Sequence, residues 1–186
     1  MQSPAMLVDL SRCIGCFSCV IACKQENSLP PGTNWVNIYS RELFSPYWQR
    51  YSFPNSCRHC HQPACAAICP VGALEMTPEQ VVIYHGHRCI GCYLCHSVCP
   101  YNAISENIKP SKCTLCYHLQ QRGAIPACAQ VCPTKARVFS SREEILKEAE
   151  ERVFKLQSAQ KAVQLVGNTG PTKSSVLFLA PNVPVW

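Results

Sequence analysis

The most regular alternation of apolar and polar positions lies near the C-terminal end of the chain. Two overlapping capping-box matches, at residues 140–143 and 141–144, predict that a helix begins there. Apolar side chains then recur every three or four residues, as on one face of a helix: Ile145, Ala149, Val153, Leu156, Ala159 and Val163. The pattern predicts an amphipathic helix that ends at Gly167 and packs on the domain itself. The tail, Ser175–Val185, is expected to form a strand or an arm laid on a neighbour.

The rest of the chain carries only short apolar runs. Residues 72–76 and 80–84 flank a Thr-Pro turn and predict a β-hairpin. The aromatic-rich stretch Trp35–Phe53 is interpreted as a strand and a connecting loop. No run reaches the roughly 18 apolar residues of a membrane-spanning helix, and the first six residues lack the basic and apolar regions of an export signal. We therefore expect no transmembrane segment and no signal peptide in this chain.

The composition is unusual in cysteine and in charge. Sixteen of the 186 residues are Cys and only 15% are charged, against roughly 25% in an ordinary soluble domain. These figures exclude a disordered, collagen-like or coiled-coil chain. The net charge is +6, but the basic residues do not gather among aromatic side chains, so no nucleic acid is expected as a partner. Basic residues near cysteines either compensate charge locally or are simply solvated: Arg12, Lys24, Arg88 and Lys112.

The sixteen cysteines form four groups of four, with none left over. The first and third groups share the spacing Cys-x2-Cys-x2-Cys-x3-Cys, and they are Cys13, Cys16, Cys19 and Cys23, and Cys89, Cys92, Cys95 and Cys99. The second group, Cys-x2-Cys-x4-Cys-x3-Cys, is Cys57, Cys60, Cys65 and Cys69. The fourth group, Cys-x2-Cys-x11-Cys-x3-Cys, is Cys113, Cys116, Cys128 and Cys132. All groups but the first end in Cys-Pro.

Three kinds of site compete for such a pattern. Disulfides need an oxidising compartment, and the chain shows no export signal. A structural zinc ion takes two Cys-x2-Cys half-sites, whereas three cysteines on one tight loop suit three corners of a larger object. A triplet followed by a fourth Cys before Pro is the spacing of bacterial ferredoxins, in which the fourth Cys ligates the neighbouring cluster of a pair. Sixteen ligands therefore predict four [4Fe–4S] clusters, with a zinc-rich binding module as the alternative that metal analysis would separate.

Repeats outside the cysteines predict how the chain is organised. Cys-Ile-Gly-Cys recurs, and so do three segments that begin with Cys-Pro, at 69–74, 99–104 and 132–137. We predict an α+β fold of two ferredoxin-like units that each hold two [4Fe–4S] clusters, with short helices, hairpins and a C-terminal helix. The domains expected are an inserted unit at 57–105, an outer unit formed by 1–34 and 106–140, a connecting strand and loop at 35–56, and the C-terminal amphipathic helix and tail at 141–186.

No catalytic constellation stands out. The chain has no Gly-rich phosphate loop, no Ser, His and Asp in a catalytic order and no paired carboxylates near the cysteines, so no catalytic residue is predicted. Several histidines lie close to cysteine groups: His59, His61, His85, His87 and His96. Because the cysteine count is complete without them, we expect packing or surface roles, with hydrogen bonding to a cluster as the alternative for His59 or His96.

Taken together, these segments resemble a known family: the four-cluster electron-transfer subunit of the dimethyl sulfoxide reductase superfamily of molybdenum or tungsten enzymes. Polysulfide, thiosulfate, arsenate and nitrate reductases and formate dehydrogenases have similar subunits. The matching segments are Cys13–Cys16, Ala22–Asn27, Pro63–Cys65, Cys69–Ala73, Cys89–Cys92, Pro126–Cys128 and Cys132–Thr134.

The resemblance implies four ligand sets. Cluster 1 takes Cys13, Cys16, Cys19 and Cys132, and cluster 2 takes Cys23, Cys113, Cys116 and Cys128. Cluster 3 takes Cys57, Cys60, Cys65 and Cys99, and cluster 4 takes Cys69, Cys89, Cys92 and Cys95. Some relatives replace one cysteine and hold a [3Fe–4S] centre, whereas this chain has Cys at every one of these positions.

The resemblance also implies a role and partners. The chain is expected to be a non-catalytic subunit that relays single electrons between a molybdopterin-containing catalytic subunit and a quinone-reactive membrane subunit or another redox partner. The cysteine pattern also suits the same relay in a [NiFe]-hydrogenase or a multihaem reductase, or a free polyferredoxin. Assembly is expected in the cytoplasm, and work at the periphery of the cytoplasmic membrane, on either face.

Overall fold

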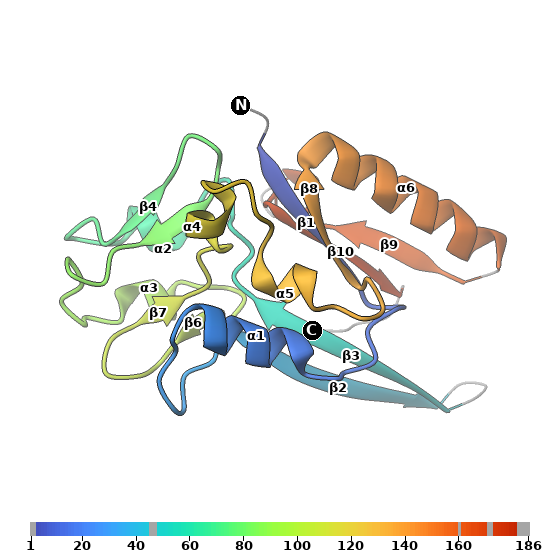
Figure 1. Cartoon of the computed structure of the whole chain (residues 1–186), viewed down its shortest axis with the longest axis horizontal. Helices are drawn as coiled ribbons and strands as arrows, with labels where there is room; N and C mark the ends of the chain where they lie inside the picture. The colour runs from blue at the N-terminus through green and yellow to red at the C-terminus, as the bar shows by residue number, and fades with distance from the viewer. Residues whose placement is uncertain (1–2, 45–47, 160, 171–172, 182–186) are drawn as a thin grey trace.

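The computed structural model describes residues 3–44, 48–159, 161–170 and 173–181. Within them the chain is a mixed α/β protein with six helices, one four-stranded sheet and three two-stranded sheets (Figure 1). The four-stranded sheet and its covering helix lie on one side of the molecule, and most of the short helices lie on the other. No helix in these ranges is long and apolar enough to cross a membrane.

The four-stranded sheet joins the two ends of the chain. Its order is β8 (Arg137–Ser141), β1 (Pro4–Asp9), β10 (Val176–Pro181) and β9 (Val163–Val166). β1 is parallel to β10, and the two outer pairs are antiparallel. The N-terminal and C-terminal strands are therefore neighbours at the centre of one sheet.

Both faces of this sheet are covered, as alternating side chains on a strand allow. Helix α6 (Arg142–Ser158) packs on one face, where the buried residues are Ala5, Leu7, Ile145, Ala149, Leu177 and Leu179. The opposite face contributes to a second core with Met6, Val8, Phe53, Val176 and Phe178. This second core also contains Leu115 and Cys128, so it joins the sheet to the segments that carry cysteines.

The C-terminal helix is present but shorter than predicted, and a strand follows it. The predicted amphipathic helix is present, and it begins at the second capping box, where Ser141 Oγ accepts a hydrogen bond from the Glu144 amide at 3.3 Å. The predicted end at Gly167 is wrong: α6 ends at Ser158, because Val163–Val166 pair with β10 as a strand. Within the predicted tail, Val176–Pro181 form strand β10, as one alternative predicted, and this strand is buried between β1 and β9 of its own chain. Residues 182–185 of the tail lie outside the described residues.

The aromatic-rich stretch forms a long ribbon. β2 (Val36–Phe44) and β3 (Trp48–Ser56) pair antiparallel along their whole length. The prediction of one strand and a connecting loop over Trp35–Phe53 is therefore wrong, because residues such as Tyr39 and Phe53 lie opposite one another across two strands.

Short elements carry the cysteine groups. The helices are α1 (Ser18–Glu26), α2 (Ala64–Ala67), α3 (Leu94–Ser97), α4 (Tyr117–Gln120) and α5 (Ala127–Gln130). The small sheets are β4 (Leu74–Met76) with β5 (Val82–Tyr84), which confirms the predicted hairpin, and β6 (Ile104–Ser105) with β7 (Ser111–Lys112). α1 contacts α5, and α2 contacts α3. The first cysteine group therefore meets the fourth, and the second meets the third.

Candidate functional site

The first and third cysteine groups are bent by the same backbone conformation. Gly15 and Gly91 have φ of +68° and +74°, and Phe17 and Tyr93 have φ of 62° and 59°. A left-handed residue thus lies between successive cysteines of each triplet, where it turns the chain sharply. α1 and α3 begin directly after Phe17 and Tyr93. The loop and the helix that follows it therefore present the thiols of one group in two directions.

Three cavities are each lined by four cysteines that come from two different groups. The first is lined by Cys13, Cys16, Cys19 and Cys132. The second is lined by Cys23, Cys113, Cys116 and Cys128. The third is lined by Cys69, Cys89, Cys92 and Cys95. In each case three thiols of one group meet a single thiol of its partner group.

The remaining four cysteines act on one another electrostatically. Burial and then the thiols of Cys57 and Cys99 raise the pKa of Cys60 to about 11. Burial, Cys57, Cys99 and Cys60 raise the pKa of Cys65 to about 12, although Lys112 opposes that shift. Cys57, Cys60, Cys65 and Cys99 therefore lie near one another.

The donor set suits an iron–sulfur cluster. All sixteen cysteines are free thiols. Two buried nitrogens beside them, Nε2 of His59 and Nε of Arg137, have no hydrogen-bond partner among the described atoms. A buried N–H group without an acceptor is costly, and the sulfides of a bound cluster would supply acceptors. Within the described residues, no three His, Cys, Asp or Glu side chains are placed to hold a single metal ion.

Burial makes these thiols poor anions until a metal binds. Burial raises the pKa of Cys23 to about 12 and that of Cys113 well above its usual range, and neighbouring thiols add to both shifts. Cys16, Cys69 and Cys57 are exceptions whose pKa values are lowered, and of these only Cys57 is buried. Burial opposes its ionisation, but interaction with His59, whose backbone N–H donates to Cys57 Sγ at 3.5 Å, and the positive charge of Lys112 outweigh that effect and lower its pKa to about 5. Because metals bind the thiolate, these raised pKa values imply that cluster binding releases protons.

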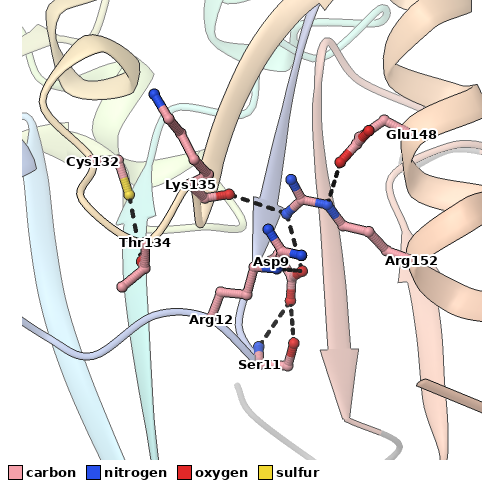
Figure 2. A network of polar contacts seen from close by, with 8 residues as sticks. All are labelled: Asp9, Ser11, Arg12, Cys132, Thr134, Lys135, Glu148 and Arg152. Carbon is pink, nitrogen blue, oxygen red and sulfur yellow. Dashed lines mark hydrogen bonds and ion pairs between the residues drawn. The ribbon is translucent and has the colours of Figure 1, made fainter. Parts of the chain in front are cut away.

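A buried polar network supports the loops of the first cavity (Figure 2). Asp9 ends β1, and its carboxylate accepts hydrogen bonds from Ser11 N at 3.0 Å and from Arg152 Nη1 of α6 at 3.1 Å. Arg152 Nη1 also donates to the carbonyl oxygen of Lys135 at 3.1 Å, and Arg152 Nε donates to Glu148 Oε1 at 2.6 Å. Ser11 and Lys135 lie two and three residues from cysteines of the first cavity. The network therefore ties α6 to both loops that carry those cysteines.

The basic residues singled out by position have different environments. Arg12 pairs with Asp9 at 3.6 Å, Arg88 pairs with Glu75 at 3.7 Å, and Lys24 donates to the Thr33 carbonyl oxygen at 2.7 Å. Lys112 is completely buried. It is the residue of this set whose surroundings fit compensation of cluster charge.

No role was predicted for Arg137, although the repeats in the sequence contain a signal for one. It is buried, and its Nη1 lies 3.4 Å from Cys128 Sγ. In the three Cys-Pro repeats it occupies the position that Leu74 and Ile104 occupy in the other two. A charged residue at a repeat position that is otherwise apolar is the clue that identifies it.

The histidines follow the packing and surface prediction for the most part. His96 is partly exposed, pairs with Glu106 at 3.1 Å and contacts Asn102. His59 is completely buried, and its Nδ1 accepts a hydrogen bond from the Val82 amide at 3.1 Å. Because its other ring nitrogen has no partner among the described atoms, His59 keeps the alternative of donating to a cluster.

The segments that carry the cysteines are similar to known iron–sulfur domains. Residues 48–142 match a family described as the 4Fe-4S dicluster domain, and residues 10–28 match a 4Fe-4S binding domain. A tetrathionate reductase subunit of Salmonella typhimurium is 32% identical, covering 94% of this chain and 71% of the relative. A subunit of the anaerobic dimethyl sulfoxide reductase of Escherichia coli is 35% identical over 75% and 74% of the two proteins. The arsenate respiratory reductase iron–sulfur subunit of Shewanella is 28% identical over 89% and 92%.

Proposed function

Because this protein belongs to the family of iron–sulfur subunits of dimethyl sulfoxide reductase-type molybdenum oxidoreductases, we propose that it relays single electrons through four [4Fe–4S] clusters. The observation that carries the proposal is that cysteines from paired groups converge, four at a time, on separate cavities. Bound clusters would supply the one-electron redox chemistry, over potentials that span roughly −700 to +450 mV in proteins. The chain itself holds, separates and shields them.

The four ligand sets follow from this convergence. Clusters 1, 2 and 4 would occupy the three cysteine-lined cavities, and cluster 3 would be held by Cys57, Cys60, Cys65 and Cys99. Residues 57–105 then form an inserted two-cluster unit, and the flanking segments form the outer one. The contacts of α1 with α5 and of α2 with α3 support this division.

The clusters would form a linear path in numerical order. Cys128 of the second set helps to raise the pKa of Cys19 of the first, and Cys57 of the third set helps to raise the pKa of Cys113 of the second. The third and fourth sets share α2, because Cys65 lies on that helix and Cys69 follows it by two residues. An electron that enters at one end therefore has a neighbouring centre at each step.

Both ends of this path lie beneath exposed apolar side chains. Beside cluster 1, Ile14, Phe17 and Ile21 are 67%, 51% and 63% exposed. Beside cluster 4, Ile90 and Leu94 are 62% and 43% exposed. Exposed apolar groups of this kind mark interaction surfaces. We propose that a molybdopterin-containing catalytic subunit docks at one end, and a quinone-reactive membrane subunit or another redox partner docks at the other.

Metal and cofactor analysis of the complex purified without oxygen tests the relay. Four clusters of four irons predict about sixteen iron atoms and as many acid-labile sulfides per chain, with pterin in the large partner. Zinc without sulfide would overturn the proposal, and nickel or haem in the partner would assign the relay to another enzyme class.

Charge substitutions test the docking surfaces. Phe17→Lys should release one partner and Leu94→Lys the other, with the iron content unchanged. Phe154→Lys is the matched control, because Phe154 is 72% exposed on α6 and lines none of the three cysteine cavities. Equal loss of partners in all three variants, or in none, would refute the assignment of these surfaces.

A further inference from the structure

Two buried cations lie among the cysteines without a carboxylate partner. Lys112 is fully buried, and its Nζ donates to the backbone carbonyl oxygens of Val82 and Cys113. Arg137 is 3% exposed, and its guanidinium donates to Cys128 Sγ at 3.4 Å and to the Pro54 carbonyl oxygen at 3.2 Å. Within the described ranges of the chain, neither side chain has an Asp or Glu oxygen within 4.0 Å.

Another buried cation, Arg152, has the usual carboxylate partners. Arg152 is 5% exposed, and it is neutralised by Asp9 and by Glu148. A buried charge without such a partner is strongly unfavourable. In Lys112 and Arg137 the compensating negative charge must therefore come from elsewhere, and the thiolates and sulfides of bound clusters are the negative groups at hand.

The positions of the two cations single out one cluster. Arg137 contacts Cys128 of cluster 2 and also favours the ionised forms of Cys13 and Cys19, which belong to cluster 1. Lys112 precedes Cys113 of cluster 2 and favours the ionised forms of Cys57 and Cys65, which belong to cluster 3. The set formed by Cys23, Cys113, Cys116 and Cys128 therefore lies beside both Arg137 and Lys112. Of these two cations, cluster 1 lies beside Arg137 and cluster 3 beside Lys112, and cluster 3 also has the buried Arg58 beside Cys57.

We propose that Arg137 and Lys112 are positioning residues that raise the reduction potential of cluster 2 by the permanent positive charge that both place beside it. The inference rests on the proposed function, since it concerns clusters held by these cysteines. Reduction adds one electron, delivered by a neighbouring cluster of the relay, and thus one unit of negative charge to cluster 2. No proton is taken up and no bond is broken. A fixed cation stabilises the reduced form more than the oxidised form, so the electron resides longer on cluster 2 than it would without the two side chains.

The test is a redox titration of the whole complex, followed by electron paramagnetic resonance, in single variants that remove each charge. Lys112→Met should make reduction of clusters 2 and 3 at least tenfold less favourable, which is a shift of about −59 mV for one electron. Arg137→Met should do the same to clusters 1 and 2. Cluster 2 alone should respond to both substitutions, and cluster 4 to neither.

Charge-conserving and matched controls separate electrostatics from packing. Lys112→Arg should keep the potentials near those of the native complex. Lys147→Gln removes a solvent-exposed cation of α6 that contacts no cysteine loop, and it should leave all four potentials unchanged. The Lys112→Met and Arg137→Met variants test the inference independently. If one of them fails to assemble, the cluster potentials measured in the other still decide the outcome.

Two results would overturn the inference. One is an unchanged potential of cluster 2 in an assembled Met variant, and the other is an equal shift of all four clusters. Either result differs from a failure of the proposed function, in which the native complex would lack four cluster signals and the iron and sulfide that accompany them.

Discussion

The buried ion pair between Arg152 of α6 and Asp9 of β1 makes a sharp prediction about stability. Replacing Arg152 with Gln removes a contact of 3.1 Å to a carboxylate that is 1% exposed. Breaking a buried pair by removing one partner typically destabilises a protein by about 3–5 kcal/mol, because the other charge stays buried. Asp9 would keep its hydrogen bonds from Ser11 N and Ser11 Oγ, at 3.0 and 2.6 Å. We therefore expect the low end of that range, about 3 kcal/mol.

The contacts of Arg152 support the same magnitude. The charge-assisted bond to Asp9 contributes about 1.5–3 kcal/mol and the bond to the Lys135 carbonyl oxygen about 1 kcal/mol. The pair with Glu148, which is 40% exposed, adds only about 0.5 kcal/mol after screening by solvent. The Asp9 contact is therefore the largest part of the expected loss.

Urea denaturation under anaerobic conditions measures the effect, followed through visible cluster absorbance and circular dichroism. With a slope of about 2 kcal/mol per molar urea, a loss of 3 kcal/mol lowers the midpoint by roughly 1.5 M. Arg12→Gln is the matched control. Arg12 pairs with the same carboxylate at 3.6 Å, but its side chain is 46% exposed, so it should lose less than about 1 kcal/mol. Asp9→Asn combined with Arg152→Gln should be less harmful than the two single changes together. Equal losses for Arg12→Gln and Arg152→Gln would refute the reasoning.

Three further substitutions probe the local backbone. Ser141→Ala removes the side chain that caps α6 at the Glu144 amide and should destabilise the protein by about 1 kcal/mol in the same denaturation assay; no change would mean that the cap is dispensable. Gly15→Ala and Gly91→Ala both place a side chain at positive φ, but only at Gly15 would the new Cβ lie 2.6 Å from Ser52 Oγ, whereas nothing lies within 4 Å at Gly91. Iron analysis should therefore show a larger loss of cluster from Gly15→Ala than from Gly91→Ala, and the reverse order would contradict the role of the ribbon strand β3 in shaping that loop.

Local patterns in the sequence were sufficient where the structure depends on neighbouring residues. The hairpin of β4 and β5 and the start of α6 were predicted because a turn or a cap is encoded within a few residues. The end of α6 was missed for the opposite reason. The apolar spacing continues to Val163, but pairing with β10 places that residue in a strand.

The iron–sulfur clusters were predicted from the spacing of sixteen cysteines, because a short loop with three thiols has few uses other than a cluster, and the family and its electron-transfer role from the resemblance of the segments around them. Only the tertiary structure decided which basic side chains are buried beside them. Lys112 and Arg12 both precede a cysteine, yet one is enclosed and the other is half-exposed at the end of β1. Arg137 lies beside Cys128 because β8 is held against β1, and β1 in turn is paired with the last strand of the chain. Burial and long-range pairing depend on residues from opposite ends of the sequence, and no local pattern can encode them.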